Sequence, residues 1–229
     1  MMARLRVVNL GLPKSGTTTL GVALRASGLT VADWKIRRHQ STNPAVARHF
    51  VGDLMYRGYF ETGDPLHLLG EFDAMTEINV VGGDLNRWPQ TDWGLLSAII
   101  DHHPDVKFIL SHREPEAHAD SMIRWTNLGR KRLRIFDVPG LPGKYGSAPA
   151  DIVRWIDGHS RFCRRIFAGD PRFLEYDILD PEAPTKIGAF LGLPIQWWGT
   201  VNENPETGAE TVTDAVTEPE TTPTEDPAS

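Results

Sequence analysis

Near the start of the chain, eight residues combine two glycines, a lysine and three hydroxyl side chains: Gly11-Leu12-Pro13-Lys14-Ser15-Gly16-Thr17-Thr18. Glycines allow a tight turn in which backbone N–H groups converge, and a cluster of N–H groups binds anions. The hydroxyls of Thr17 and Thr18 add donors, and Lys14 adds a full positive charge. This combination predicts a binding site for a phosphate or a sulfate ester.

The flanking residues predict the elements that hold this loop. Before it comes a short apolar run, typical of a strand buried on both faces of a parallel sheet: Leu5, Val7, Val8 and Leu10. After it, apolar side chains recur at the period of a helix: Leu20, Ala23 and Leu24. The start of this helix then directs its dipole and its free N–H groups at the same anion.

The position of the lysine separates two kinds of phosphate chemistry. In nucleoside triphosphatases the loop reads G-x-x-x-x-G-K-[ST], with the lysine directly after the second glycine. Here Thr17 follows Gly16, and Lys14 lies inside the loop. A structural turn with a surface lysine is the alternative that the loop alone leaves open.

A second strand and helix carry further polar residues. An apolar run from Val106 to Leu110 predicts a strand, and Arg113 follows it. Ser121 comes eight residues later, two turns into the next expected helix. Arg113 and Ser121 can therefore converge on a second phosphate.

Carboxylates occur where a third strand is expected. Asp73 and Glu77 lie near its end, and a carboxylate at the carboxyl end of a parallel strand points into the crevice where ligands bind. A role for Asp73 as a helix cap or a structural partner of Lys14 is the alternative. Farther along, Asp92 is expected to cap an apolar helix that ends near His102.

Composition bounds the function. The chain has 229 residues, with 30 acidic and 24 Lys or Arg residues, and eight of the acidic ones lie after Asn202, where no Lys or Arg occurs. The remaining body has a net charge of about +2, which suits a small polyanionic ligand better than a nucleic acid.

The lone Cys163 excludes an intramolecular disulfide. No apolar run has the length of a membrane span, and no signal peptide is evident, so we expect a cytoplasmic protein.

The two anion motifs together resemble those of a known family. Pro13-Lys14-Ser15-Gly16-Thr17-Thr18 resembles the 5′-phosphosulfate-binding loop of sulfotransferases that use 3′-phosphoadenosine 5′-phosphosulfate (PAPS). The spacing from Arg113 to Ser121 resembles the 3′-phosphate motif of the same enzymes. Phe190-Leu191-Gly192-Leu193-Pro194, followed by Val201-Asn202-Glu203, is similar to the C-terminal end of their domains.

The resemblance implies a three-layer α/β fold of the P-loop type, with a central parallel sheet flanked by helices. It covers a single domain over residues 1–202, closest to the compact group of these enzymes. Residues 203–229 form an acidic Thr/Glu/Pro-rich tail, for which the composition predicts disorder.

The resemblance also assigns roles within sulfuryl transfer from PAPS to a hydroxyl or amine of an unidentified small-molecule acceptor, with no metal required. The cofactor-binding residues would be Pro13, Lys14, Ser15, Gly16, Thr17, Thr18, Arg113 and Ser121. Lys14 would stabilise charge on the departing phosphate oxygen. Asp73 is the first choice for the general base, Glu77 the second and His112 the third.

Several alternatives stay open. The catalytic histidine and the Arg-Lys-Gly motif of the larger steroid and phenol sulfotransferases have no clear match, unless Arg130-Lys131 replaces the latter. The basic run Arg37-Arg38-His39 is either solvated surface or a substrate contact. Residues 126–148 are either a mobile loop over the ligand or a solvated connection. A small-molecule kinase and a non-catalytic nucleotide-binding protein are the competing functions, and the oligomeric state is unknown.

Overall fold

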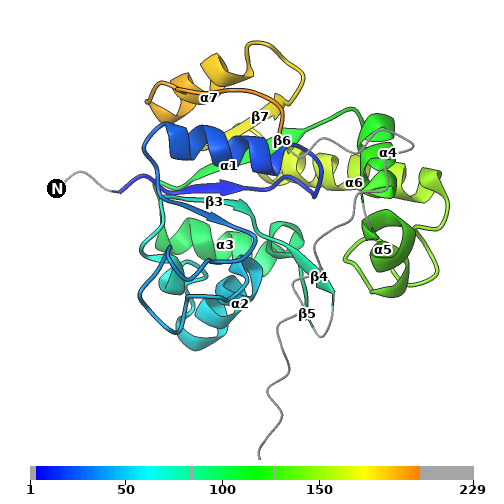
Figure 1. The fold of residues 1–229 in the computed structure, drawn as a ribbon, viewed down its shortest axis with the longest axis horizontal. Coiled ribbons are helices and arrows are strands. Elements are labelled where there is room, and N and C mark those ends of the chain that lie inside the picture. The colour runs from blue at the N-terminus through cyan, green and yellow to red at the C-terminus, as the bar shows by residue number, and fades with distance from the viewer. Residues whose placement is uncertain (1–3, 83–84, 126, 202–229) are drawn as a thin grey trace, which may run out of the picture.

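A computed structural model describes residues 4–82, 85–125 and 127–201. The expected domain boundary after residue 202 and the acidic tail lie outside the described residues. The core of the fold is a five-stranded sheet in the order β2-β3-β1-β6-β7, in which every pair of neighbours is parallel (Figure 1). Its strands are β1 (Val7–Asn9), β2 (Val31–Asp33), β3 (Ala74–Glu77), β6 (Lys107–His112) and β7 (Phe173–Asp177).

Helices connect these strands and form the outer layers. They are α1 (Thr17–Ala26), α2 (Val51–Thr62), α3 (Trp93–His102), α4 (Pro115–Arg124), α5 (Leu133–Ile135), α6 (Pro149–Ile166) and α7 (Ala183–Leu191). Short 3₁₀ turns lie at His67–Leu69 and Pro89–Thr91, and a π-helical segment at Leu128–Arg132. An antiparallel hairpin of β4 (Val80–Gly82) and β5 (Leu85–Arg87) follows β3 and was not expected from the sequence.

Alternate residues of β1 face the two layers, as the apolar run predicted. Val8 packs with Leu54 of α2, Leu96 of α3 and Cys163 of α6. Val7 packs on the opposite face, with Leu20 of α1 and with α7. In Figure 1, α1 and α7 lie above the sheet and α2 and α3 below it. The expected three-layer α/β fold with a parallel sheet is therefore confirmed.

Residues 127–148 pack more closely than either sequence alternative predicted. Leu133, Val138 and Leu141 are buried, in one cluster with residues of α4 and α6. The glycines and prolines of this segment suggested an exposed loop, but the apolar residues between them anchor it. The segment is therefore part of the wall beside the site.

Asn43-Pro44 is a favourable local start for a helix, with proline at the first helical position, but α2 begins only at Val51. The Asn43 side chain does accept a hydrogen bond from the Ala45 N–H group, at 3.0 Å. That turn ends at Arg48, whose φ of 69° is left-handed, and Arg48 then pairs with Ile36 across a neighbouring segment. A tertiary contact thus overrides the local helix signal.

The parallel arrangement brings three segments together at the carboxyl ends of the strands. The loop after β1, the end of β3 and the residues after β6 all lie at carboxyl ends of neighbouring strands. Ligands of open α/β sheets bind at this edge. No described helix is long and apolar enough to cross a bilayer, and no group of three potential metal-ligating side chains occurs among the described residues.

We expect Asp92→Ala to lower the free energy of unfolding by about 1–2 kcal/mol. Asp92 caps α3 as predicted: one carboxylate oxygen accepts from the N–H groups of Gly94 (2.9 Å) and Leu95 (3.4 Å), and the other accepts from the Tyr56 hydroxyl (3.0 Å). Urea unfolding measures the loss. Asp101→Ala, at an exposed position of the same helix, is the control and should change little. Equal effects of the two substitutions would remove the capping role.

Candidate active site

The loop after β1 is held in place by its surroundings. The Asn9 carboxamide oxygen accepts from the N–H groups of Gly11 (3.2 Å) and Ser111 (3.3 Å), and its NH₂ group donates to the Thr76 carbonyl (2.8 Å). Asn9 thereby joins the ends of β1, β3 and β6. One buried side chain therefore fixes the carboxyl ends of three strands relative to one another.

Two buried histidines hold the loop backbone from the other side. Nε2 of His159 lies 2.7 Å from the Leu10 carbonyl oxygen, and Nε2 of His118 lies 2.7 Å from that of Pro13. Burial lowers the pKa of each ring to about 4. Both imidazoles are therefore neutral at physiological pH, and each donates its Nε2 proton to a carbonyl.

The turn into α1 requires glycine. Gly16 has a φ of 96°, and a Cβ atom there would lie 2.5 Å from the Ile178 side chain. The first turn of α1 follows at once, with Thr17 and Thr18 facing the cleft described below. The N–H groups of a first helical turn have no acceptor inside the helix, so they are available to an anion.

Ser15 has a different place from the one expected. Its hydroxyl is buried and lies 2.7 Å from that of Ser111, and its N–H group donates to the Leu12 carbonyl. Ser15 therefore shapes the loop from beneath and does not line the cleft. Of the loop residues expected to bind the cofactor, Ser15 is thus the one whose side chain faces away from the cleft.

Lys14 lies at the tip of the loop in a left-handed conformation, with a φ of 69°. Its Nζ atom is 3.4 Å from the ring centroid of Trp125, which immediately follows α4. Burial lowers the pKa of Lys14 to about 8, against the attraction of Glu77 and with added repulsion from Arg113 and Arg124. Lys14 is thus still mostly protonated at pH 7 and loses its charge around pH 8.

Glu77 is the last residue of β3 and faces the same cleft as Lys14. Burial, with added repulsion from Asp33, raises the pKa of its carboxyl to about 7 against the opposing attraction of Lys14 and Arg132. A carboxyl that titrates near neutral pH can accept a proton from a hydroxyl group. Its position and its pKa both suit a general base.

Arg113 and Ser121 lie on the other side of the loop. Arg113 directly follows β6, and its Nε atom is buried without a hydrogen-bond partner among the described residues. Ser121 is buried on α4, and both side chains line the cleft. A buried guanidinium N–H without an acceptor is costly, so an anion bound here would satisfy it.

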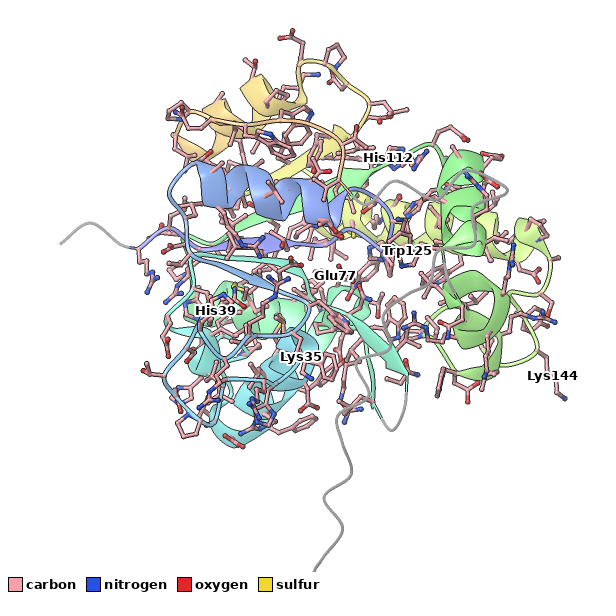
Figure 2. All side chains as sticks on the ribbon, viewed as in Figure 1. Lys35, His39, Glu77, His112, Trp125 and Lys144 are labelled. Atoms are coloured by element: carbon pink, nitrogen blue, oxygen red, sulfur yellow. The ribbon has the colours of Figure 1, made fainter. Side chains whose placement is uncertain are left out.

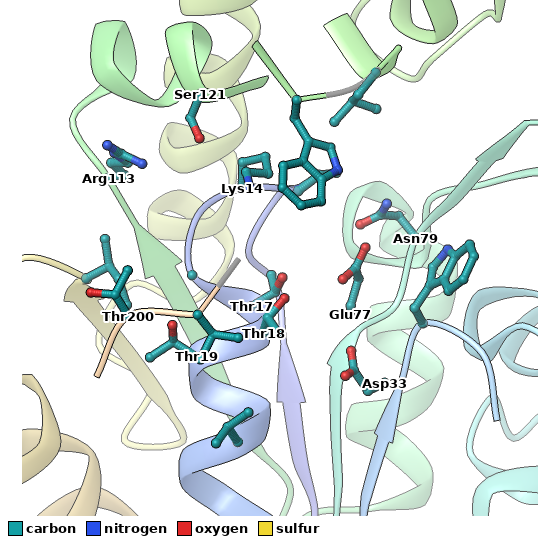
Figure 3. A pocket seen from close by; sticks show the side chains of 18 of the residues that line it. Lys14, Thr17, Thr18, Thr19, Asp33, Glu77, Asn79, Arg113, Ser121 and Thr200 are labelled. Atoms are coloured by element: carbon teal, nitrogen blue, oxygen red, sulfur yellow. The ribbon is translucent and has the colours of Figure 1, made fainter. Parts of the chain in front are cut away.

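These groups share one cleft of about 1320 Å³. Figure 3 shows Arg113 and Ser121 on one side of Lys14, and Glu77, Asn79 and Asp33 on the other. The cleft also extends past Thr200 and Trp198 near the C-terminal end of the described chain. Of the sequence-predicted residues it therefore brings together Pro13, Lys14, Gly16, Thr17, Thr18, Glu77, Arg113 and Ser121.

Asp73 lies at the amino ends of the strands, on the side of the sheet away from the cleft. It precedes β3, so it stands at the amino end of that strand, outside the cleft. Its carboxylate accepts from Nε of Arg4 (2.6 Å) and from the N–H group of Thr30 (2.8 Å). Burial opposes the shift, but the hydrogen bonds from Arg4 and Thr30 lower the pKa of Asp73 overall. The expectation of Asp73 as the general base is wrong, because strand direction carries it away from Lys14.

His112 is also directed elsewhere. Its Nδ1 atom lies 3.9 Å from a carboxylate oxygen of Glu175 on the neighbouring β7. His112 does not line the cleft, whereas Glu77 and Trp125 do. Figure 2 accordingly shows His112 apart from Glu77, on the upper side of the molecule.

Sequence reasoning missed several residues of this site. Trp125 is four residues beyond Ser121 and so on the same side of the chain, and Asn79 is two beyond Glu77, so spacing could have found both. The roles of His118 and His159 had no such signal, because their partners lie 105 and 149 residues away.

Comparison with known proteins gives three findings. A family model described as a sulfotransferase domain matches residues 6–137. Among solved structures, a sulfotransferase from Alicyclobacillus acidocaldarius is similar, with 16% sequence identity and a TM-score of 0.45, over 90% of this chain and 88% of that one. Curated protein sequences show no significant match.

The family match spans more than half of the 229 residues and includes the loop around Lys14, the strand end at Glu77 and Arg113. On this ground the chain belongs to the sulfotransferase domain family.

Proposed function

We propose that the protein transfers a sulfuryl group from PAPS to a hydroxyl or amine of a small molecule. The observation that carries this proposal is the meeting of Lys14 and Glu77 in one cleft, with pKa values of about 8 and about 7. One group can stabilise negative charge, and the other can remove a proton, at the same pH.

The residues of the cleft fit such a donor. The unpartnered Nε of Arg113 and the hydroxyl of Ser121 would hold the 3′-phosphate. The loop, the first turn of α1, Thr17 and Thr18 would hold the 5′-phosphosulfate. When bound, PAPS supplies an activated sulfuryl group and leaves as adenosine 3′,5′-bisphosphate.

The chain's own groups then have distinct tasks. The Lys14 ammonium, kept over the face of Trp125, offsets the charge that develops on the phosphate oxygen. Glu77 takes the proton of the acceptor hydroxyl or amine. Asn79 lines the cleft two residues beyond Glu77, and its carboxamide oxygen accepts a hydrogen bond from the Gln90 side chain at 3.1 Å.

The first test is nucleotide discrimination. Arg113→Ala should weaken binding of adenosine 3′,5′-bisphosphate about 10- to 100-fold and that of adenosine 5′-phosphate far less, because only the former carries the 3′-phosphate. Isothermal titration calorimetry measures both, with Arg165→Ala on the exposed side of α6 as the control. Equal losses for the two nucleotides would contradict the proposal. Tighter binding of ATP with Mg²⁺ than of adenosine 3′,5′-bisphosphate would favour a kinase.

Lys14→Ala should lower kcat about 10²- to 10³-fold, the usual effect of removing one donor that acts on transition-state charge. Release of adenosine 3′,5′-bisphosphate in the presence of a phenolic acceptor measures the rate. Lys144→Ala is the control, since Lys144 is another left-handed lysine and lies outside the cleft. A rate for Lys14→Ala within a few-fold of the parent would remove Lys14 from the mechanism.

The pH dependence of kcat/KM should be a narrow bell. The rate rises with pH near 7 as Glu77 becomes ionised and able to accept a proton, and it falls near 8 as Lys14 loses its charge. Glu77→Gln should lower the rate strongly and abolish the rising limb. A Glu77→Gln enzyme that keeps both the limb and the rate would show that another group is the base.

A further inference from the structure

Left-handed backbone conformations gather around the cleft. Among the described residues, four that are not glycine have positive φ: Lys14, Trp34, Arg48 and Lys144. The first three line the cleft, whereas Lys144 lies at the far edge of the molecule (Figure 2). This conformation is unfavourable for large side chains, and where the surrounding structure imposes it, it marks a candidate functional position. The turn of the loop accounts for the left-handed conformation of Lys14. The same conformation at Trp34 and Arg48 needs a separate explanation.

Trp34 is held by hydrogen bonds on both sides of its backbone. Its N–H group donates to the Glu77 carbonyl at 2.9 Å, and its carbonyl accepts from the N–H group of Val51 at 2.8 Å. The indole makes an edge contact with Phe50, at 5.1 Å between centroids, yet 44% of Trp34 remains exposed. The fold therefore keeps a large flat apolar side chain open to the cleft, on the residue bonded to the proposed base.

Arg48 is held against the segment that follows Trp34. The Ile36 N–H group donates to the His49 carbonyl at 2.9 Å, and the Arg48 N–H group donates to the Ile36 carbonyl at 2.8 Å. This pairing brings Arg37 and Arg48 to the same part of the cleft rim. Both side chains are exposed and line the cleft. Arg37 is the one residue of the basic run Arg37-Arg38-His39 that lines it.

The charge on this rim is uncompensated. Neither Arg37 nor Arg48 forms an ion pair with a carboxylate in the described part of the chain. Asp33, the nearby acidic residue, is paired with Arg25 at 3.2 Å. Two arginines next to an open indole form a recognition surface for a negative charge and a flat ring.

Resting on the proposed function, we propose that the acceptor is a flat-ringed molecule that also carries an anionic group. Its ring lies against Trp34, its anionic group is held by Arg37 and Arg48, and its hydroxyl or amine is presented to Glu77. The donor half of the cleft, around Arg113 and Ser121, takes no part in this recognition.

The test uses three probes that share a phenol ring and differ in charge: N-acetyltyrosine, its neutral amide, and tyramine. Their affinities are measured by calorimetry on the full chain saturated with adenosine 3′,5′-bisphosphate. N-acetyltyrosine should bind about tenfold more tightly than the amide, and tyramine most weakly, because two arginines favour the anion. Equal affinities of the three probes, or no binding by any of them, would overturn the inference.

Variants assign the effect to residues. Arg37→Gln with Arg48→Gln should weaken binding of N-acetyltyrosine about tenfold and leave the amide within about twofold. Arg38→Gln is the matched control, since Arg38 is the exposed neighbour outside the cleft lining, and it should leave both probes unchanged. Trp34→Ala should weaken both probes alike. If the double variant lost as much affinity for the amide as for N-acetyltyrosine, the inference would also be overturned.

A nucleotide titration separates the two proposals. Every variant should bind adenosine 3′,5′-bisphosphate as the parent does, which also shows that it is folded. Failure of the parent to bind this nucleotide would defeat the proposed function. Normal nucleotide binding without a preference for the anionic probe would defeat only the acceptor inference.

Discussion

The position of Lys14 depends on buried hydrogen bonds that hold the loop backbone from outside. Asn9 bonds the loop to the ends of two neighbouring strands, and His118 and His159 donate to loop carbonyls from α4 and α6. A φ of 69° at Lys14 is unfavourable for a lysine and is maintained by such bonds, whereas glycine adopts the φ of 96° at position 16 readily. Because both rings have a pKa of about 4, they stay neutral donors over the pH range in which Lys14 and Glu77 titrate.

Burial acts on Lys14 and Glu77 in opposite directions. It disfavours the charged form of each, so it lowers the pKa of the amine and raises that of the carboxyl, while their mutual attraction limits both changes. In water an amine and a carboxyl would titrate about six pH units apart. In the cleft they titrate about one pH unit apart, so the range in which Glu77 is ionised while Lys14 is charged narrows to about pH 7–8, and the raised pKa makes Glu77 a stronger base.

The cleft divides at Lys14 into two chemically distinct halves. The half around Arg113 and Ser121 offers buried donors, and the Nε–H group of Arg113 has no acceptor within the described part of the chain. The half around Trp34 offers an exposed indole and exposed arginines. Buried donors suit a ligand of fixed shape, whereas exposed charges on a rim discriminate by charge and less by geometry.

The residue pattern alone was sufficient for the strand, loop and helix around Lys14 and for the α3 cap at Asp92. Both depend on local spacing: apolar residues in a short run, glycines around a lysine, or a carboxylate before an apolar helix. The parallel three-layer fold was expected from the resemblance of the two anion motifs to those of a known family. The sequence also predicted that Arg113 and Ser121 lie close together, because a strand end and two helical turns fix their separation, and both line the cleft.

The tertiary structure decided which carboxylate faces Lys14. Asp73 and Glu77 are four residues apart, but they lie at the amino and carboxyl ends of the short strand β3, on opposite edges of the sheet. If the strand ended a few residues earlier, Asp73 instead of Glu77 would lie at its carboxyl end, so the sequence could not rank them. It also could not place Trp34, Arg48, His118 and His159, since their conformations and partners result from contacts between segments that lie apart in the sequence.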